Sequence, residues 1–379
     1  MKETCPVSRR CGGCAYIEGS YENSLLQKYD ALKNIYHTSK IEPFIGMQNP
    51  YHYRHKVYAS FGYNSKHKLV AGMYQEDSHK PVFFDHCLIQ DELANKIINE
   101  FCRIADSMHI EAYDENNRRG VLRHLYIRTS ADSKKTMAVI VIGSRELPGS
   151  RKLISLLRTA CPEIITVILD YNNARTSMVL SGREKTLFGP GYLNDRLNGL
   201  TFSISPRSFF QVNPAQTEVL YKKAIELAAL EKEDKVIDVC CGIGTITLLA
   251  ASYCNSALGI EIVPQAIADA KSNAMKNNVK NVRFVCADAN EQLKRYAEGC
   301  TAAILDPARA GLEESALKAL AEAKIKRIVY ISCNPLTHAR DLEVLKRCGY
   351  KVKTLQPVDM FPFTKHVETV ALLVRTEGQ

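Results

Sequence analysis

The sequence has no long apolar run and no N-terminal targeting segment. No stretch of about 18 consecutive apolar residues occurs among its 379 residues, so we expect no transmembrane helix. The first residues contain no apolar segment flanked by a cleavage site, which argues against secretion. We therefore predict a cytoplasmic protein whose thiols stay reduced and form no disulfides.

Cysteine, by contrast, is abundant, with 13 residues in the chain. In a cytoplasmic protein, clustered cysteines indicate metal binding or catalysis before disulfides. The net charge of +9 favours an anionic partner such as nucleic acid, without identifying one. The hydrophobic content of 46% and the charged content of 24% are typical of a globular protein, and the length suggests two domains.

The C-terminal half alternates apolar runs with helical patterns, which is typical of a mostly parallel, doubly wound sheet. Asn213–Pro214 predicts the start of the first helix, with a cap followed by proline. Strands are expected over 235–242, 256–261, 282–288, 301–307, 327–333 and 367–375, and helices over 214–230, from 245, and over 264–278, 313–324 and 335–348. Such sheets bind ligands at the carboxyl ends of their strands, so we predict an α/β cofactor-binding domain over residues 206–379.

The glycine-rich loop of this domain lacks one residue of the dinucleotide fingerprint. In DVCCGIGTITLLA, Gly242 and Gly244 are present, but Thr247 occupies the place of the third glycine. Glu261 ends the following strand, where a carboxylate can accept hydrogen bonds from ribose hydroxyls, and Asp288 ends the third strand, where it can face an adenine ring. This combination favours the nucleoside site of an S-adenosylmethionine-dependent methyltransferase over an NAD enzyme.

Cys333 ends the fifth strand, beside the Asp306–Pro307 end of the fourth. Most free cysteines are small buried hydrophobes, but this one would face an active site. Methylation of nitrogen or oxygen needs no thiol, whereas C5 of uracil is too weak a nucleophile. A thiolate that adds to C6 activates C5, and a general base must then remove the C5 proton. Glu368, which begins the last apolar strand, offers that base; the alternative is a solvated strand end.

Five motifs, SFFQVNP, CGIGT, LDPARAG, ISCNP and HVETV, occur in the order found in one family. The chain resembles bacterial RNA uracil-C5 methyltransferases, which include 23S ribosomal RNA enzymes and the transfer-RNA T-loop enzyme. The resemblance implies that Cys333 is the nucleophile and Glu368 the base. It also implies that S-adenosylmethionine and uracil are bound by Gln211, Cys240, Gly242, Glu261, Asp288 and Asp306. The family usually has an aromatic residue in place of Cys240, which implies looser packing on the cofactor.

A second group of thiols lies in the N-terminal stretch CPVSRRCGGC, where Cys5, Cys11 and Cys14 can form a set of four with the isolated Cys87. Four thiolates suit zinc or a [4Fe–4S] cluster. Zinc sites usually have two CxxC pairs, and this set has one. The resemblance implies a [4Fe–4S] cluster, because the ribosomal RNA members carry one on this pattern. Since methyl transfer involves no net electron transfer, we expect the cluster to have a structural or RNA-positioning role. The core is expected to hold Cys102, Cys161, Cys241, Cys254, Cys286, Cys300 and Cys348.

The region from residue 49 to 205 is expected to be β-rich, with strands over 53–63, 121–130, 135–143, 166–173 and 176–182. Basic and aromatic side chains alternate there, as suits binding of phosphates and unpaired bases, although a solvated sheet face is the alternative. The basic residues are Arg54, His55, Lys56, Arg118, Arg119, Arg123, His124 and Arg128, and the aromatic ones are Tyr53, Tyr58 and Tyr126. We predict an RNA-binding domain over 1–205, whose segment 17–48, including a helix over 21–37, packs on the catalytic domain.

These inferences predict a cluster-bearing RNA uracil-C5 methyltransferase that flips its target base out of a folded loop. The 747-type site of 23S ribosomal RNA is the expected target, because Cys5 lies too near the N-terminus for a preceding β-barrel domain. A transfer-RNA T-loop uracil is the alternative substrate. Two other classes stay open: a nitrogen-directed methyltransferase with Cys333 in the core, and a non-catalytic iron–sulfur RNA-binding module. No membrane contact and no obligate protein partner are expected.

Overall fold

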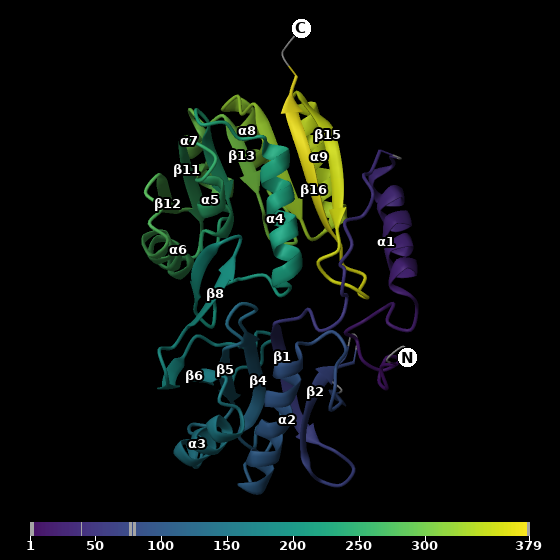
Figure 1. Cartoon of the computed structure of the whole chain (residues 1–379), viewed down its shortest axis with the longest axis vertical. Helices are drawn as coiled ribbons and strands as arrows, with labels where there is room; N and C mark the ends of the chain where they lie inside the picture. The colour runs from purple at the N-terminus through teal and green to yellow at the C-terminus, as the bar shows by residue number, and fades with distance from the viewer. Residues whose placement is uncertain (1–3, 39, 76–77, 79–80, 377–379) are drawn as a thin grey trace. The chain divides into compact units, whose positions relative to one another are not determined.

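A computed structural model of the chain describes residues 4–38, 40–75, 78 and 81–376. The chain forms two compact units (Figure 1). The first comprises Met1–Ser20, Asn49–Asp195 and Ile204–Arg207, and the second Tyr21–Gln48, Arg196–Ser203 and Ser208–Gln379. The chain therefore passes between the units several times, whereas the prediction set one boundary after residue 205 and assigned only segment 17–48 of the preceding part to pack on the catalytic domain. Within the described residues, no helix combines the length and the apolar character needed to cross a membrane.

The second unit is built on one seven-stranded sheet of order β12-β11-β10-β13-β14-β16-β15. Its strands are β10 (Lys235–Val239), β11 (Ser256–Glu261), β12 (Val282–Cys286), β13 (Ala302–Leu305), β14 (Arg327–Ser332), β15 (Tyr350–Val358) and β16 (Glu368–Arg375). All neighbours are parallel except β16, which is antiparallel to both β14 and β15. This confirms the predicted doubly wound sheet. Strand β15 was not predicted, because its alternating lysines resemble a solvated segment.

Helices cover both faces of this sheet (Figure 1). They are α1 (Tyr21–Tyr36), α4 (Pro214–Ala228), α5 (Thr245–Ala250), α6 (Pro264–Lys276), α7 (Ala289–Ala297), α8 (Glu314–Glu322) and α9 (Pro335–Arg347). The strand order reverses between β10 and β13, so right-handed crossovers place α5 and α6 on one face and α8 and α9 on the other. Helices α4 and α9 begin as predicted, because Asn213 and Asn334 each accept a backbone N–H at 3.2 Å before a proline.

Helix α1 is fixed to the segment that precedes β16 by a buried ion pair. Lys28 Nζ lies 2.7 Å from Asp359 Oδ1, and the two side chains are 1% and 0% exposed. Lys28 also donates to the Phe361 carbonyl at 3.0 Å, and the Tyr21 hydroxyl donates to Asp359 Oδ2 at 2.9 Å. A buried pair of this kind is costly to break on one side, so it holds α1 in one register.

The first unit contains a mixed sheet of order β3-β2-β1-β4-β5-β6-β7. Its strands are β1 (Lys56–Tyr63), β2 (Leu69–Tyr74), β3 (Pro81–Phe83), β4 (Leu122–Thr129), β5 (Thr136–Ile142), β6 (Ile164–Tyr171) and β7 (Glu184–Phe188), with helices α2 (Glu92–Ser107) and α3 (Ser150–Ala160). A two-stranded ribbon of β8 (Leu193–Leu197) and β9 (Leu200–Ile204) lies at the boundary of the units.

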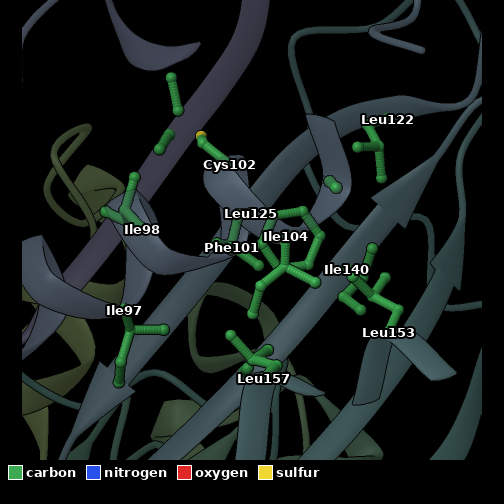
Figure 2. Packing of buried hydrophobic residues seen from close by; sticks show 14 of the residues in the cluster. Ile97, Ile98, Phe101, Cys102, Ile104, Leu122, Leu125, Ile140, Leu153 and Leu157 are labelled. Atoms are coloured by element: carbon green, nitrogen blue, oxygen red, sulfur yellow. The ribbon is translucent and has the colours of Figure 1, made fainter. Parts of the chain in front are cut away.

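Two predictions for this unit, and one for the cysteines of both units, differ from the structure. Helices α2 and α3 were not predicted, although apolar residues recur at helical spacing along α2 (Figure 2). The expected strand over 176–182 does not form, and β7 begins at Glu184 instead. Of the seven cysteines expected in the core, Cys102, Cys161, Cys241 and Cys254 are buried, but Cys286 is exposed and Cys300 and Cys348 are half-buried.

The predicted row of RNA-contacting side chains on β4 is also wrong, because every side chain of that strand is buried. Arg128 donates to the Tyr126 hydroxyl at 2.7 Å, and His124 Nδ1 lies 3.0 Å from the Ser60 hydroxyl. One face of the sheet packs on α2 and α3, and the other on a second apolar cluster that includes Tyr126 and Leu193. Arg118 and Arg119, in the loop before β4, are exposed. Alternation in a sequence therefore does not show solvent exposure when both faces of a sheet are covered.

Candidate active site

The loop that follows β10 leaves open space beside Gly242. Gly242 has a φ of 54°, and a Cβ added there would meet nothing within 4 Å. Gly244, with a φ of 84°, lies against the Phe284 ring, where a Cβ would come within 2.9 Å. The two glycines thus have different roles. Gly244 allows the loop to pack closely on β12, and Gly242 leaves open space, here called the cradle, that a ligand can occupy.

Glu261, the last residue of β11, bonds directly to this loop. Its carboxylate accepts the backbone N–H of Gly242 at 3.1 Å and that of Val263 at 2.9 Å. Two backbone donors fix one carboxylate at the carboxyl end of the sheet, next to the open space. This is the position that the sequence predicted for a ribose-binding acid.

A pocket at this edge of the second unit brings together four of the predicted residues, Gln211, Cys240, Gly242 and Asp306. Burial, together with the nearby carboxylates, raises the pKa of Cys240 to about 12. Cys240 is therefore a neutral thiol at neutral pH. Asp288 has a different role in the structure: its carboxylate accepts the Asn290 N–H at 2.8 Å and caps α7.

Two residues of this region were missed by sequence reasoning. Tyr221 of α4 lines the pocket and is buried. Asp238 lies in the middle of β10 and is fully buried; its Oδ2 accepts the Thr247 hydroxyl at 2.5 Å, while its Oδ1 has no partner within the described residues. Burial raises the pKa of Asp238 to about 7. A carboxylate inside an otherwise apolar strand is the signal that could have identified it.

Cys333 directly follows β14, and Glu368 is the first residue of β16. Strand β14 pairs antiparallel with β16, and the last register pair is Ser332 with Thr369. Continued by one residue beyond the end of β14, this register sets Cys333 opposite Glu368, whose charge acts on the Cys333 thiol. Directly opposed residues in an antiparallel pair have Cβ atoms about 4.5–5.5 Å apart. The nucleophile and the base predicted from two distant motifs are therefore neighbours at the carboxyl end of β14.

The charges around this pair favour protonated forms. Burial, together with Glu368 and Asp306, raises the pKa of Cys333 to about 11. Glu368 is 3% exposed, its Oε2 has no partner within the described residues, and burial followed by Asp306 raises its pKa well above the usual value. Arg309 opposes these shifts for both groups. Two carboxyl groups and a thiol thus lie close enough to raise one another's pKa, an arrangement typical of acid–base sites.

The turn that carries Cys333 is fixed by the loop after β13. The Arg309 carbonyl accepts the Asn334 side-chain amide at 3.0 Å and the Thr337 hydroxyl at 3.0 Å. The Arg309 guanidinium donates to His366 Nδ1 at 2.8 Å, two residues before Glu368. The LDPARAG, ISCNP and HVETV motifs are therefore joined through Arg309, which sequence reasoning did not single out.

The four N-terminal thiols lie in the first unit and line one pocket. Cys5, Cys11, Cys14 and Cys87 surround it together with apolar side chains. Burial, together with the neighbouring Cys87, Cys11 and Cys5, raises the pKa of Cys14 to about 12. Yet in the part of the chain that the structure describes, no three His, Cys, Asp or Glu side chains are spaced to hold a metal ion. The shared pocket matches the predicted set, whereas a formed metal site is not shown.

The sheet order, the cradle at Gly242 and the acid that ends β11 define a Rossmann-like, class I S-adenosylmethionine-dependent methyltransferase fold. A sequence model described as tRNA (Uracil-5-)-methyltransferase matches residues 177–376. The chain belongs to this family, and it is an S-adenosylmethionine-dependent RNA methyltransferase.

Relatives and one solved structure extend the match to the whole chain. An uncharacterized RNA methyltransferase of Halalkalibacterium halodurans is 40% identical over 98% of this chain and 83% of its own length. An uncharacterized RNA methyltransferase of Caldanaerobacter subterraneus subsp. tengcongensis is 41% identical over 98% of this chain and 84% of its own length. The crystal structure of the Pyrococcus abyssi tRNA (uracil-54, C5)-methyltransferase with S-adenosyl-L-homocysteine has a TM-score of 0.81 at 26% identity, covering 98% of this chain and 87% of that one.

Proposed function

We propose that this enzyme methylates C5 of a uridine in RNA through a covalent bond between Cys333 and C6 of the base. The observation that carries the proposal is the strand register that sets Cys333 opposite Glu368, beside Asp306. A nitrogen-directed enzyme needs neither a thiol nor a second buried acid at this place. A non-catalytic RNA-binding module has no use for the cradle at Gly242.

Cys333 acts first as the nucleophile, and Glu368 acts afterwards as the general base. The Cys333 thiol gives its proton to solvent, and the thiolate adds to C6. The π electrons of the C5–C6 bond then form a C4–C5 double bond, and those of the C4–O4 bond move onto O4, which gives an enolate. S-adenosylmethionine would supply the methyl group that C5 accepts, with S-adenosylhomocysteine as the leaving group. The Glu368 carboxylate then removes the C5 proton; the released electron pair restores the C5–C6 double bond and expels the Cys333 thiolate.

The pocket of the second unit suits the methyl donor. Its open backbone at Gly242 accommodates a ligand, and the Glu261 carboxylate, held by two N–H groups, is an acceptor for ribose hydroxyls. Gln211, Cys240 and Asp306 line the same pocket. We assign S-adenosylmethionine binding to these five residues, while the adenine contact expected of Asp288 competes with its role as the cap of α7.

We further propose that the four thiols of the first unit hold a [4Fe–4S] cluster. All four line one apolar pocket, as a cluster with four thiolate ligands requires. Bound there, the cluster would tie the N-terminal segment to Cys87 and stabilise the unit proposed to bind RNA, residues 1–205 apart from 17–48.

The proposed substrate is 23S ribosomal RNA at the 747-type site, and the four-thiol pocket supports this choice through the resemblance to cluster-bearing enzymes. A transfer-RNA T-loop uracil is the second candidate, because the similar Pyrococcus abyssi structure is of a tRNA enzyme. Anaerobically purified protein should be incubated with unmodified 23S ribosomal RNA and, separately, with unmodified transfer RNA. Mass spectrometry should find 5-methyluridine at one site of the ribosomal RNA. Product in transfer RNA alone would overturn the substrate, and methyl groups on nitrogen would overturn the reaction.

The same preparation tests the cluster. We expect about four irons per chain and a visible absorbance shoulder. Stoichiometric zinc without iron would refute the cluster while leaving the methyltransferase proposal intact.

A further inference from the structure

Three side chains from three separate elements, two of them fully buried and one half-buried, form hydrogen bonds with one another next to the residues that flank Cys333 and Glu368. They are Tyr36 at the end of α1, His338 in the first turn of α9, and Thr369 at the start of β16. His338 Nδ1 lies 2.7 Å from Thr369 Oγ1 and 2.8 Å from the Tyr36 hydroxyl. The Tyr36 hydroxyl and Thr369 Oγ1 are 3.0 Å apart, which closes the triangle. We call these three residues the hydrogen-bonded triad.

The triad adjoins the proposed nucleophile and base through the backbone. Thr369 follows Glu368, and its register partner Ser332 precedes Cys333. The Thr369 hydroxyl also lies 3.5 Å from the Ser332 carbonyl, a long contact across the same strand pair. Any shift of Thr369 along or across β14 therefore moves Glu368 relative to Cys333.

His338 is fully buried and uses only one of its ring nitrogens. Nδ1 has two hydroxyl neighbours, whereas Nε2 is buried without a partner within the described residues. Burial lowers the pKa of His338 to about 3, so the ring is neutral at physiological pH. The ring is also fixed by packing on Tyr330, with centroids 4.7 Å apart. An orphaned buried nitrogen is costly, and an apolar side chain of similar volume would avoid that cost.

Tyr36 brings a distant part of the sequence into this site. Its hydroxyl reaches residues more than 300 positions later in the chain, and the rest of α1 is fixed by the buried Lys28–Asp359 pair. Helix α1 thus supplies a hydrogen bond behind the reaction centre as well as apolar packing on α9.

Building on the proposed function, we propose that Tyr36, His338 and Thr369 are positioning residues that set the relative placement of the Cys333 thiol and the Glu368 carboxyl. They touch neither substrate nor cofactor. Their effect is on the chemical steps, because misplacement of reacting groups by about 1 Å can cost about 100-fold in rate. Binding of S-adenosylmethionine, which depends on the β10 and β11 loops, should not depend on them.

The test uses pairs of variants that differ in one hydrogen-bonding atom. Thr369→Val removes the hydroxyl at constant shape, and Thr369→Ser keeps it. His338→Asn places a polar atom near the position of Nδ1, whereas His338→Gln places one near that of Nε2. Tyr36→Phe removes the third hydroxyl. Single-turnover methylation of the RNA should be measured per active site, with active sites counted by covalent trapping on 5-fluorouridine RNA, whose C5 fluorine cannot be removed as a proton.

We expect Thr369→Val, His338→Gln and Tyr36→Phe to slow methylation per active site at least tenfold, with the dissociation constant for S-adenosylmethionine within twofold of wild type. Thr369→Ser and His338→Asn should retain most of the rate. If the members of each pair behave alike, or if the variants lose only melting temperature and active fraction, the triad has a merely structural role and the inference is overturned. A wild-type enzyme that makes no 5-methyluridine would instead refute the proposed function, and with it the reaction that the triad is held to serve.

Discussion

The two units of this chain place their reactive side chains by different means. In the second unit, Cys333, Glu368 and Asp306 lie at the ends of three strands that are neighbours or near neighbours in one sheet, so backbone hydrogen bonds set their spacing. In the first unit, the four thiols come from irregular segments on either side of β1, β2 and β3. A site built on strand ends is formed before its ligand arrives. A site built from loops depends on the group that it holds.

The largest effect is expected from removing the nucleophile. Cys333→Ala should reduce methylation by about 10⁴-fold or more, because no other group can add to C6. The affinity for S-adenosylmethionine should stay within twofold, as measured by calorimetry. Cys348→Ala, at the opposite end of α9, is the matched control and should leave the rate unchanged. Substantial activity in Cys333→Ala would show that the preformed strand-end site is not used as proposed.

Removal of one thiol from the four-thiol site of the first unit should change the iron content and the stability of that unit. Cys11→Ser should lose iron and destabilise the first unit by about 3 kcal/mol, or about 6–12 °C in its melting temperature, because cluster binding contributes to folding. S-adenosylmethionine binding to the second unit should persist. Cys161→Ala is the matched control: this thiol is fully buried, so its loss weakens packing but should keep the iron. Equal iron content in Cys11→Ser and wild type would contradict the proposal that the four-thiol site holds the cluster, and with it the contrast between the two sites.

The preformed site should carry a stability cost that depends on pH. Asp238 has a folded-state pKa raised from 3.8 to about 7, chiefly by burial, so its contribution to stability is present below pH 4 and is lost as pH rises through 7. Asp238→Asn should therefore stabilise the ligand-free protein at pH 8 by about 2–4 kcal/mol and change little at pH 4. Thermal unfolding at both pH values measures this.

Asp234, just before the same strand, is the control with the opposite sign. Burial opposes ionisation there, but hydrogen bonds from Thr301 and the Glu231 amide, together with Arg327, lower its pKa below 3.8. Its stabilising contribution is present above pH 4 and is lost on acidification, so Asp234→Asn should destabilise the protein at pH 8 by about 1–2 kcal/mol. If Asp238→Asn and Asp234→Asn change the free energy of unfolding at pH 8 in the same direction, the raised pKa of Asp238 is not the cause of the change in Asp238→Asn.

The smallest effect concerns Asp288, where prediction and structure assign different contacts. Asp288→Ala should cost about 1 kcal/mol of stability through the lost cap of α7. Asp288→Asn keeps a capping oxygen, so stability and S-adenosylmethionine affinity should both stay near wild type. A loss of affinity above tenfold in Asp288→Asn would restore the adenine contact that the sequence predicted.

The same contrast explains what could be predicted from the sequence. In the second unit, apolar runs followed by Gly242, Glu261, Asp306 and Cys333 indicated both the strands and the edge at which ligands bind, because parallel strands end at one edge. The opposition of Cys333 and Glu368 was not predictable, since it depends on the antiparallel insertion of β16 between β14 and β15.

In the first unit, the basic and aromatic pattern of β4 gave the strand correctly and its exposure wrongly. Arg128 and Tyr126 bond to each other inside the sheet, because both faces are covered by segments that lie far away in sequence. The hydrogen-bonded triad was also beyond prediction: Tyr36 gives no local signal, and its role follows only from the packing of α1 against α9. Long-range packing, more than local propensity, separates what could be predicted from what could not.

The covalent mechanism is tested most directly by the base. In Glu368→Gln the thiol should still add to C6 and the methyl group should still be transferred, but the C5 proton should remain. A protein–RNA adduct that survives denaturing electrophoresis should therefore accumulate, and its amount should depend on S-adenosylmethionine. Cys333→Ala combined with Glu368→Gln should give none. Normal turnover by Glu368→Gln, or an adduct that forms equally well without Cys333, would contradict the assignment of nucleophile and base.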